Sequence, residues 1–302
     1  MVATTEVPDI PMRWILFGAQ GQLGRCLQDE LDRQQIEYRT YGRGDVDITD
    51  ATQVSECIQS FQPSVVANLA AWTDVDGAES HRDEAFAINA TGAENIAEAC
   101  ELTGAHLIHV STDYVFDGSK RTPYLIDDIT NPLGVYGASK LSGEKLVLAA
   151  HPSGTWIVRT AWLYSQYGKN FAKTILKRAM SGGSLSVVGD AWGQPTSAVD
   201  LAAQLIALAK ACPPAGVFHA TNAGDASWFD FATELTSYLD NPPVITPVTS
   251  DTFPTVAVRP TYSVLDHACW VNIGVQPMQD WRTALLDTID VIKQSAREEL
   301  KQ

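Results

Sequence analysis

The alternation of short apolar runs with amphipathic stretches is the feature that most constrains how this chain can fold. Strand-like runs occupy residues 14–17, 37–41, 65–69, 106–111 and 156–160. Helical patterns fill the intervals between them, at residues 23–34, 51–61, 83–103 and 137–150. Strands that alternate with helices form a mostly parallel sheet with helices on both faces, and such sheets bind ligands at the carboxyl ends of their strands. The pattern therefore predicts an α/β fold with a doubly wound parallel sheet.

A glycine-rich turn joins the first strand to the first helix. Residues 18–24 read GAQGQLG, which gives the spacing GxxGxxG. Glycines let a backbone approach a pyrophosphate, and the N-terminus of the following helix favours its negative charge. A plain tight turn is the alternative for this loop taken alone. In its strand–turn–helix context we expect Gly18, Gly21, Gln22, Leu23 and Gly24 to bind a dinucleotide in a Rossmann-type domain.

A tyrosine and a lysine lie four residues apart, so Tyr136 and Lys140 share one face of a helix. A nearby ammonium group lowers the pKa of a tyrosine, which can then exchange a proton with a substrate oxygen near neutral pH. Thr112, at the end of an apolar run, can hold the same oxygen. The three residues together suit reduction of a carbonyl group or the reverse oxidation, whereas a tyrosine–lysine pair alone is often an ordinary helix pair.

The pattern loosens after residue 162, where we expect only strands at 184–188 and 217–220 and a helix at 201–210. The chain of 302 residues is long enough for a large core in one domain or two lobes. We expect a flexible tail over residues 1–11. A nucleotide-binding Rossmann domain would span residues 12–165 plus roughly 196–220. Residues from roughly 166 to 195 and from 221 to 302 would form a smaller, interleaved C-terminal lobe that binds the substrate.

The net charge of −15 argues against binding to nucleic acid or to an anionic membrane. No apolar run approaches membrane-spanning length, and the N-terminus lacks the basic region and apolar core of a signal peptide. The five cysteines are scattered, which is typical of reduced thiols in a cytoplasmic protein. The six histidines show no zinc-binding spacing.

The glycine loop, Thr112, Tyr136 and Lys140 together resemble the extended short-chain dehydrogenase/reductase family. Within it, seven further segments are similar to the dTDP-4-dehydrorhamnose reductases, and with the glycine loop they extend over most of the chain from residue 12. These are NLAAWTDVD (68–76), STDYVFDG (111–118), YGASKLSGE (136–144), RTAWLY (159–164), GKNF (168–171), GQPT (193–196) and RP (259–260). The resemblance implies NADPH-dependent reduction of the C4 ketone of dTDP-4-dehydro-L-rhamnose to dTDP-L-rhamnose, the last step of dTDP-rhamnose biosynthesis.

The resemblance also implies catalytic roles. Tyr136 would give a proton to the C4 oxygen, while Lys140 would lower the tyrosine pKa and bind the nicotinamide ribose. Thr112 would hydrogen-bond the reacting oxygen, and Ser111 would point the other way in a regular strand. Asp113 would contact the sugar or help to hold the site, although a turn-forming aspartate is an equal alternative.

The residues after the second strand bear on the choice of cofactor. Arg43 can pair with a 2′-phosphate, so we expect NADPH, and a solvated loop cation is the alternative. Asp45 and Asp47 follow closely, which leaves NADH possible. By resemblance, Asp47 and Ile48 would lie beside the adenine. Three residues that follow the third strand would line the cofactor, namely Ala70, Ala71 and Trp72.

On the substrate side, the resemblance implies that Trp162 packs on the deoxysugar and that Asn170 lies near the nucleotide. Arg259 would neutralise a diphosphate. A core aromatic residue and a surface salt bridge are the alternatives for Trp162 and Arg259. Some members of the family form dimers linked by magnesium through acidic residues, but Arg25 follows the last glycine of the loop, so we expect no metal here. A monomer and a homodimer both remain open.

Two other functions remain open. Another nucleotide-sugar reductase or epimerase would use the same fold, because fold does not settle the sugar. A non-catalytic regulatory subunit is the other alternative, since an animal partner of methionine adenosyltransferase resembles this family. The intact set of Thr112, Tyr136 and Lys140 argues against a regulatory subunit, because a protein that only binds has no chemical need for it.

Overall fold

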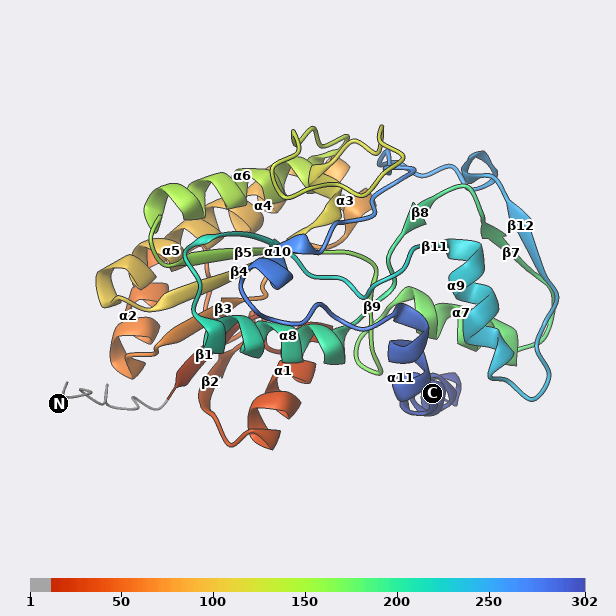
Figure 1. The fold of residues 1–302 in the computed structure, drawn as a ribbon, viewed down its shortest axis with the longest axis horizontal. Helices are drawn as coiled ribbons and strands as arrows, with labels where there is room; N and C mark the ends of the chain where they lie inside the picture. Colours follow the sequence, from red (N-terminus) through yellow and green to blue (C-terminus); the bar gives the residue numbers. More distant parts are fainter. Residues whose placement is uncertain (1–11, 302) are drawn as a thin grey trace.

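A six-stranded parallel sheet forms the centre of the computed structural model, which describes residues 12–301 (Figure 1). The expected tail of residues 1–11 lies outside the described residues. The strand order is β10-β5-β4-β3-β1-β2. Their bounds are β1 (Arg13–Phe17), β2 (Glu37–Tyr41), β3 (Val65–Asn68), β4 (His106–Thr112), β5 (Thr155–Thr160) and β10 (Gly216–His219). The prediction of a doubly wound parallel sheet is confirmed.

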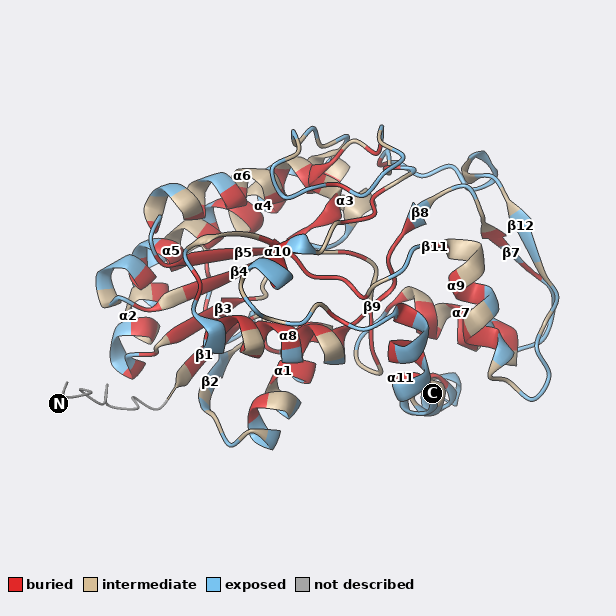
Figure 2. Ribbon diagram, in the orientation of Figure 1, coloured by how far each residue is buried: buried red, intermediate tan, exposed pale blue. Residues whose placement is uncertain are grey.

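Helices cover both faces of the sheet, and two separate apolar cores result. Trp14 and Leu16 of β1 contribute to the core beneath α1 (Gln22–Arg33) and α8 (Ala198–Ala211). Ile15 and Phe17 contribute to the opposite core beneath α2 (Ala51–Phe61) and α5 (Gly92–Thr103). Successive side chains of a strand point to opposite faces, so a strand buried on both faces must be apolar throughout. Figure 2 shows the inner strands buried and the outer faces of the helices exposed.

The chain crosses over between β1 and β3, and this is where the strand order reverses. Such a switch point leaves a crevice beyond the carboxyl ends of the two strands. Gly18 has a φ of 76°, and a Cβ at this position would lie 2.5 Å from the backbone nitrogen of Ala70. The glycine loop therefore packs directly against the loop that follows β3, which no larger residue would allow.

A second lobe contains three helices that the sequence analysis did not predict, namely α7 (Phe171–Met180), α9 (Trp228–Ser237) and α11 (Trp281–Leu300). Their core is formed by residues such as Leu176, Phe231 and Trp281. Short strand pairs complete the lobe: β6 (Leu163–Tyr164) with β9 (Thr196–Ser197), β7 (Leu185–Val188) with β12 (Ile245–Val248), and β8 (Trp192–Gly193) with β11 (Ala226–Ser227). The capping residues Asn170 and Asp280 were available signals for two of these helices.

Two expectations need correction. The helix expected at residues 83–103 is not α-helical throughout. A π-helical turn, η1 (Ala87–Thr91), lies between α4 (Arg82–Phe86) and α5. Residues 268–272, which were assigned to the substrate lobe, form α10 (Ala268–Asn272) and pack on the sheet side. There Trp270 joins the core under α8 and donates a hydrogen bond of 2.6 Å to the carbonyl of His219. The division into two lobes otherwise stays a proposal.

The remaining short elements are α3 (Val75–Ser80), η2 (Asp113–Val115) and η3 (Ser250–Thr252).

Helix α6 (Val135–Ala150) lies unusually close to its neighbours. A Cβ at Gly137 would lie 2.2 Å from the carbonyl oxygen of Tyr114, and a Cβ at Gly143 would lie 2.1 Å from that of Asn89. Because α6 carries the expected catalytic tyrosine and lysine, these two glycines fix the position of both side chains.

Replacement of Gly143 tests this close packing. On an open helix surface, Gly143→Ala would stabilise the protein by about 1 kcal/mol. Here we expect a loss of about 1–3 kcal/mol, because the methyl group would force α6 away from η1. Thermal unfolding measures the change. Gly216→Ala is the control, since nothing lies within 4 Å of its Cβ position. An unchanged or higher Tm for Gly143→Ala would contradict the packing described here.

Candidate active site

Thr112 ends β4 at the carboxyl edge of the sheet. Its hydroxyl donates to Asp113 Oδ1 over 3.0 Å and accepts from the backbone N–H of Tyr114 over 3.2 Å. Ser111 points to the other side of the strand, where it donates to Glu144 Oε1 over 2.6 Å. The alternation along β4 thus directs Thr112 and Ser111 to opposite sides, as expected for a regular strand.

Tyr136 lies in the first turn of α6, and its ring packs edge-on against Tyr114 with centroids 5.7 Å apart. Burial raises the pKa of Tyr136 to about 12, because a phenolate would lose hydration here, and the Thr112 hydroxyl acts in the opposite direction. That Lys140 lowers this pKa during the reaction stays a prediction. The ammonium of Lys140 is directed to the carbonyl oxygen of Val110, at 2.7 Å.

Lys140 is buried, and burial lowers its pKa to about 8, while the carboxylate of Glu144 acts in the opposite direction. Glu144 lies one turn further along α6 and forms a buried, two-pronged ion pair with Arg159 of β5 at 2.9 and 2.8 Å. The base of the site is therefore a row of alternating charges that links α6 to the sheet.

Asn89 is a further residue at the site that the sequence analysis missed. It lies in η1, is fully buried, and accepts from the backbone N–H of Trp72 over 2.8 Å. Its amide nitrogen donates to the carbonyl of Trp72 and to Ser139 Oγ, at 3.1 and 2.9 Å. Asn89 thus ties the loop after β3 to α6. A single asparagine within a helical pattern gives no sequence signal for this role.

The expected cofactor residues gather around the switch point. They are Gly18, Gly21, Gln22, Leu23, Gly24, Ala70, Ala71 and Trp72. The side chain of Leu23 is buried in the sheet core, which leaves its backbone as the part available to a ligand. The backbone N–H of Gly18 bonds to the carbonyl of Tyr41 over 3.0 Å, which places the end of β2 beside the loop.

The residues after β2 form a compact turn. Arg43 is exposed and lies two residues beyond the end of this strand. Asp47 accepts from the backbone N–H and the hydroxyl of Thr49, at 2.9 and 2.8 Å. Ile48 is buried and lies against Gly92. The turn thus leaves the Arg43 guanidinium in solvent at the ribose end expected of a dinucleotide site.

On the substrate side, Trp162 adopts a positive φ of 45° and stacks on Trp228, with centroids 3.5 Å apart and planes 10° apart. Its ring also covers Gly193, where a Cβ would lie 2.5 Å from the indole. A left-handed conformation is strained for a tryptophan, and strain of this kind tends to occur at functional sites. Trp162 is therefore fixed by packing rather than free in a loop.

The two other expected substrate residues make contacts within the chain. Arg259 forms an ion pair with Asp76 at 2.7 Å, which joins the C-terminal lobe to α3. Asn170 lies at the start of α7 and bonds to Gln22 of the glycine loop over 2.9 Å. The structure therefore brings Thr112 and Tyr136 together and places Asn170 beside the phosphate loop.

Within residues 12–301, no group of three or more histidine, cysteine, aspartate or glutamate side chains is placed to hold a metal ion. In the same part of the chain, the helices are too short or too polar to cross a membrane.

The fold and the relatives of this chain define an NAD(P)-dependent oxidoreductase with a Rossmann-type sheet. A family model described as the RmlD substrate binding domain matches residues 12–294, so the chain belongs to that family. It is 43% identical over 285 residues to the dTDP-4-dehydrorhamnose reductase of Streptomyces griseus, covering 93% of this chain and 94% of the relative. It is 39% identical over 281 residues to the dTDP-4-keto-6-deoxy-D-glucose reductase of Streptomyces niveus, covering 93% and 97% of the two chains. The crystal structure of the Bacillus anthracis dTDP-4-dehydrorhamnose reductase in complex with NADP has a TM-score of 0.90 and 38% identity, and the match covers 93% of this chain and 99% of that one.

The carboxyl group of Asp113 gives a prediction of pH dependence. Asp113 is buried beside Thr112, and burial raises its pKa to about 6. Between the unfolded pKa near 4 and the folded value, the folded protein binds more protons, so this group makes stability fall as the pH rises through that range. The asparagine of the Asp113→Asn variant has no charge at any of these pH values. The Tm of the variant minus the Tm of the wild type should therefore rise from pH 4 to pH 7.

Thermal unfolding at the two pH values measures this difference. Asp127→Asn, which alters an exposed carboxyl group, is the control, and its Tm difference from the wild type should be the same at the two pH values. A relative Tm for Asp113→Asn that does not change with pH would contradict the effect of burial on this carboxyl group.

Proposed function

We propose that this protein reduces the C4 ketone of dTDP-4-dehydro-L-rhamnose to dTDP-L-rhamnose with NADPH as the reductant, in the last step of dTDP-rhamnose biosynthesis. The observation that carries the proposal is the meeting of Thr112 and Tyr136 at the carboxyl edge of the sheet, where only β3 separates β4 from the strand β1 that precedes the glycine loop. The chain belongs to a family that includes reductases of this sugar, and this membership supports dTDP-4-dehydro-L-rhamnose as the substrate.

The glycine loop fits a dinucleotide, because the space where Gly18 would carry a Cβ is filled by the backbone of Ala70. Backbone N–H groups at the start of α1 would hold the pyrophosphate, and NADPH when bound supplies the hydride. Arg43 would pair with the 2′-phosphate, while Asp47 and Ile48 would lie beside the adenine. Ala70, Ala71 and Trp72 would line the cofactor.

The protonation state of Tyr136 suits the reductive direction. With a pKa of about 12, the phenol keeps its proton at neutral pH and can donate it to the oxygen that gains charge during reduction. Thr112 would donate a hydrogen bond to the same oxygen and hold it in place. The ammonium of Lys140 would stabilise the phenolate that remains after proton transfer and would bind the nicotinamide ribose.

Three residues would serve the nucleotide sugar. Asp113 would contact the sugar or hold the site, Trp162 would pack on the deoxysugar, and Arg259 would neutralise the diphosphate. The ion pair with Asp76 means that Arg259 must share or leave this partner to reach a phosphate.

A second candidate is reduction of another 4-keto deoxysugar. The Streptomyces niveus relative is named for dTDP-4-keto-6-deoxy-D-glucose and is nearly as similar as the relatives named for dehydrorhamnose. We further propose a cytoplasmic location, in line with five cysteines that form no disulfide, and either a monomer or a homodimer.

Removal of the Tyr136 hydroxyl tests its role. Tyr136→Phe should lower kcat by about 10²–10⁴-fold, because it removes the proton donor of the transition state. The Kd for NADPH, measured by fluorescence titration, should stay near the wild-type value. Tyr114→Phe is the matched control, since its ring lies beside Tyr136 and the hydroxyl is lost in the same way. Turnover by Tyr136→Phe at the wild-type rate would exclude it as the donor.

Replacement of Arg43 tests the choice of cofactor. Arg43→Ala should raise KM for NADPH by about tenfold, because one charge-assisted contact to the 2′-phosphate is lost. KM for NADH should change little. Arg39→Ala removes another exposed arginine, within β2 itself, and serves as the control. An equal change in KM for both cofactors would show that Arg43 does not read the 2′-phosphate.

A further inference from the structure

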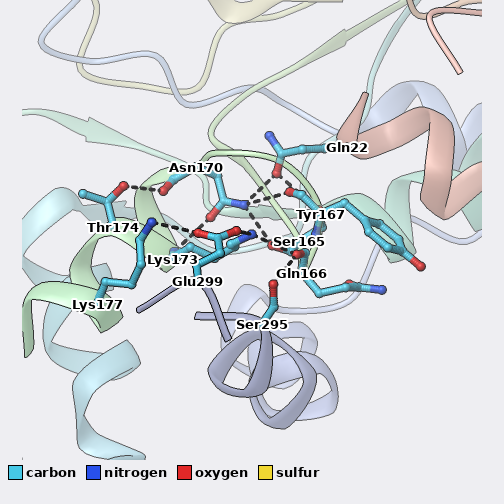
Figure 3. Close-up of polar contacts among 10 residues, drawn as sticks. All are labelled: Gln22, Ser165, Gln166, Tyr167, Asn170, Lys173, Thr174, Lys177, Ser295 and Glu299. Atoms are coloured by element: carbon cyan, nitrogen blue, oxygen red, sulfur yellow. Dashed lines mark hydrogen bonds and ion pairs between the residues drawn. The ribbon is translucent and has the colours of Figure 1, made fainter. Parts of the chain in front are cut away.

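Asn170 joins the glycine loop to the second lobe (Figure 3). Its amide nitrogen donates to Gln22 Oε1 over 2.9 Å, and the hydroxyl of Ser165 donates to the same oxygen over 3.2 Å. Gln22 is the first residue of α1, at the end of the helix where the pyrophosphate is expected. Asn170 is itself the N-cap of α7. One buried amide thus connects the N-termini of two helices.

The orientation of the Asn170 amide is fixed by its surroundings. Its Oδ1 accepts from the backbone N–H of Lys173 over 3.0 Å, and a backbone N–H can only donate. Its Nδ2 faces the carbonyl oxygens of Ser165 and Tyr167, at 2.8 and 3.3 Å, which can only accept. The atom of Gln22 that meets Nδ2 must therefore be an oxygen.

It follows that Gln22 turns its Nε2 group away from Asn170, as Figure 3 shows. Within residues 12–301, no hydrogen bond is formed by this NH₂ group. An amide nitrogen offers two donors and no acceptor, so it suits an anion. The chain has a net charge of −15, which repels an anionic cofactor. The neutral NH₂ group of Gln22 would therefore add affinity for a pyrophosphate at this point.

The segment that holds Gln22 is anchored on both sides. On the second lobe, Lys173 donates to the carbonyl of Gln166 over 3.1 Å and forms an ion pair with Glu299 of α11. On the sheet side, the guanidinium of Arg25 in α1 lies over the ring of Tyr167, 5.4 Å from its centroid. The position of Asn170 is therefore set before any ligand binds.

We propose that Asn170 is a positioning residue for the cofactor, which holds the Gln22 amide with its NH₂ group toward the pyrophosphate. This role replaces the direct substrate contact expected for Asn170, since its own amide is fully used within the chain. The inference rests on the proposed binding of NADPH at the glycine loop.

Asn170→Ser tests the inference. Serine keeps the cap of α7, because its hydroxyl can still accept from Lys173, but it leaves Gln22 free to turn. We expect the Kd for NADPH, titrated by fluorescence without any sugar, to rise about fivefold. Asn170→Asp should cause a larger rise, because a carboxylate draws the Gln22 nitrogen toward itself and presents Oε1 to the pyrophosphate. Equal Kd values for both variants and the wild type would overturn the inference.

A double-mutant cycle separates positioning from a general structural effect. Gln22→Met alone should raise the Kd for NADPH about tenfold. Adding Asn170→Ser to it should change little more, since the amide that Asn170 orients is already gone. If the two losses multiply to about fiftyfold instead, Asn170 acts independently of Gln22 and the inference fails.

Thr174→Val is the matched control, because its hydroxyl donates to the Asn170 carbonyl over 2.8 Å without touching Gln22. It should bind NADPH as the wild type does, and a loss equal to that of Asn170→Ser would overturn the inference. Failure of the wild type to bind NADPH would contradict the proposed function. Equal binding of NADPH by the wild type and all variants would contradict only the positioning role of Asn170.

Discussion

The site depends on places where two backbones meet with no room for a Cβ. Gly18 touches the loop after β3, and Gly143 of α6 touches the carbonyl of Asn89. The first contact sets the glycine loop against the neighbouring strand, and the second sets α6 against the π-helical turn η1. The buried side-chain amide of Asn89 also bonds to Trp72 and to Ser139, so the loop after β3 and α6 are placed relative to one another by a backbone contact and by one buried amide.

Burial sets the resting protonation state of the proposed proton donor. A tyrosine with a pKa of about 12 is a donor at neutral pH, and it becomes a base only when a nearby charge stabilises the phenolate. Lys140 can supply this charge, but burial already lowers its own pKa to about 8. The two groups therefore suit proton delivery to a ketone, and both shifts arise from burial rather than from their mutual attraction.

The inner strands β1, β3, β4 and β5 could be predicted because they are mostly apolar and buried on both faces. The edge strand β2 is polar and mostly exposed, and it could be predicted because it lies between two strongly patterned helices. The π-helical turn could not be predicted, because its residues fit the pattern of an ordinary helix. The capping residues Asn170 and Asp280 mark the starts of α7 and α11, but the hydrophobic pattern of the second lobe alone does not predict these helices. Motif resemblance located Tyr136 and Thr112, but it could not show that Asn170 faces Gln22, since that contact joins residues 148 positions apart.

Transfer of deuterium from NADPH that carries deuterium at both C4 positions of the nicotinamide is the most direct test of the proposed reduction. The wild-type protein would be incubated with labelled NADPH and dTDP-4-dehydro-L-rhamnose, and the product examined by mass spectrometry and proton NMR. We expect dTDP-L-rhamnose with one deuterium at C4 of the sugar and none elsewhere. Bound but unconsumed NADPH, or a product without deuterium at C4, would contradict it.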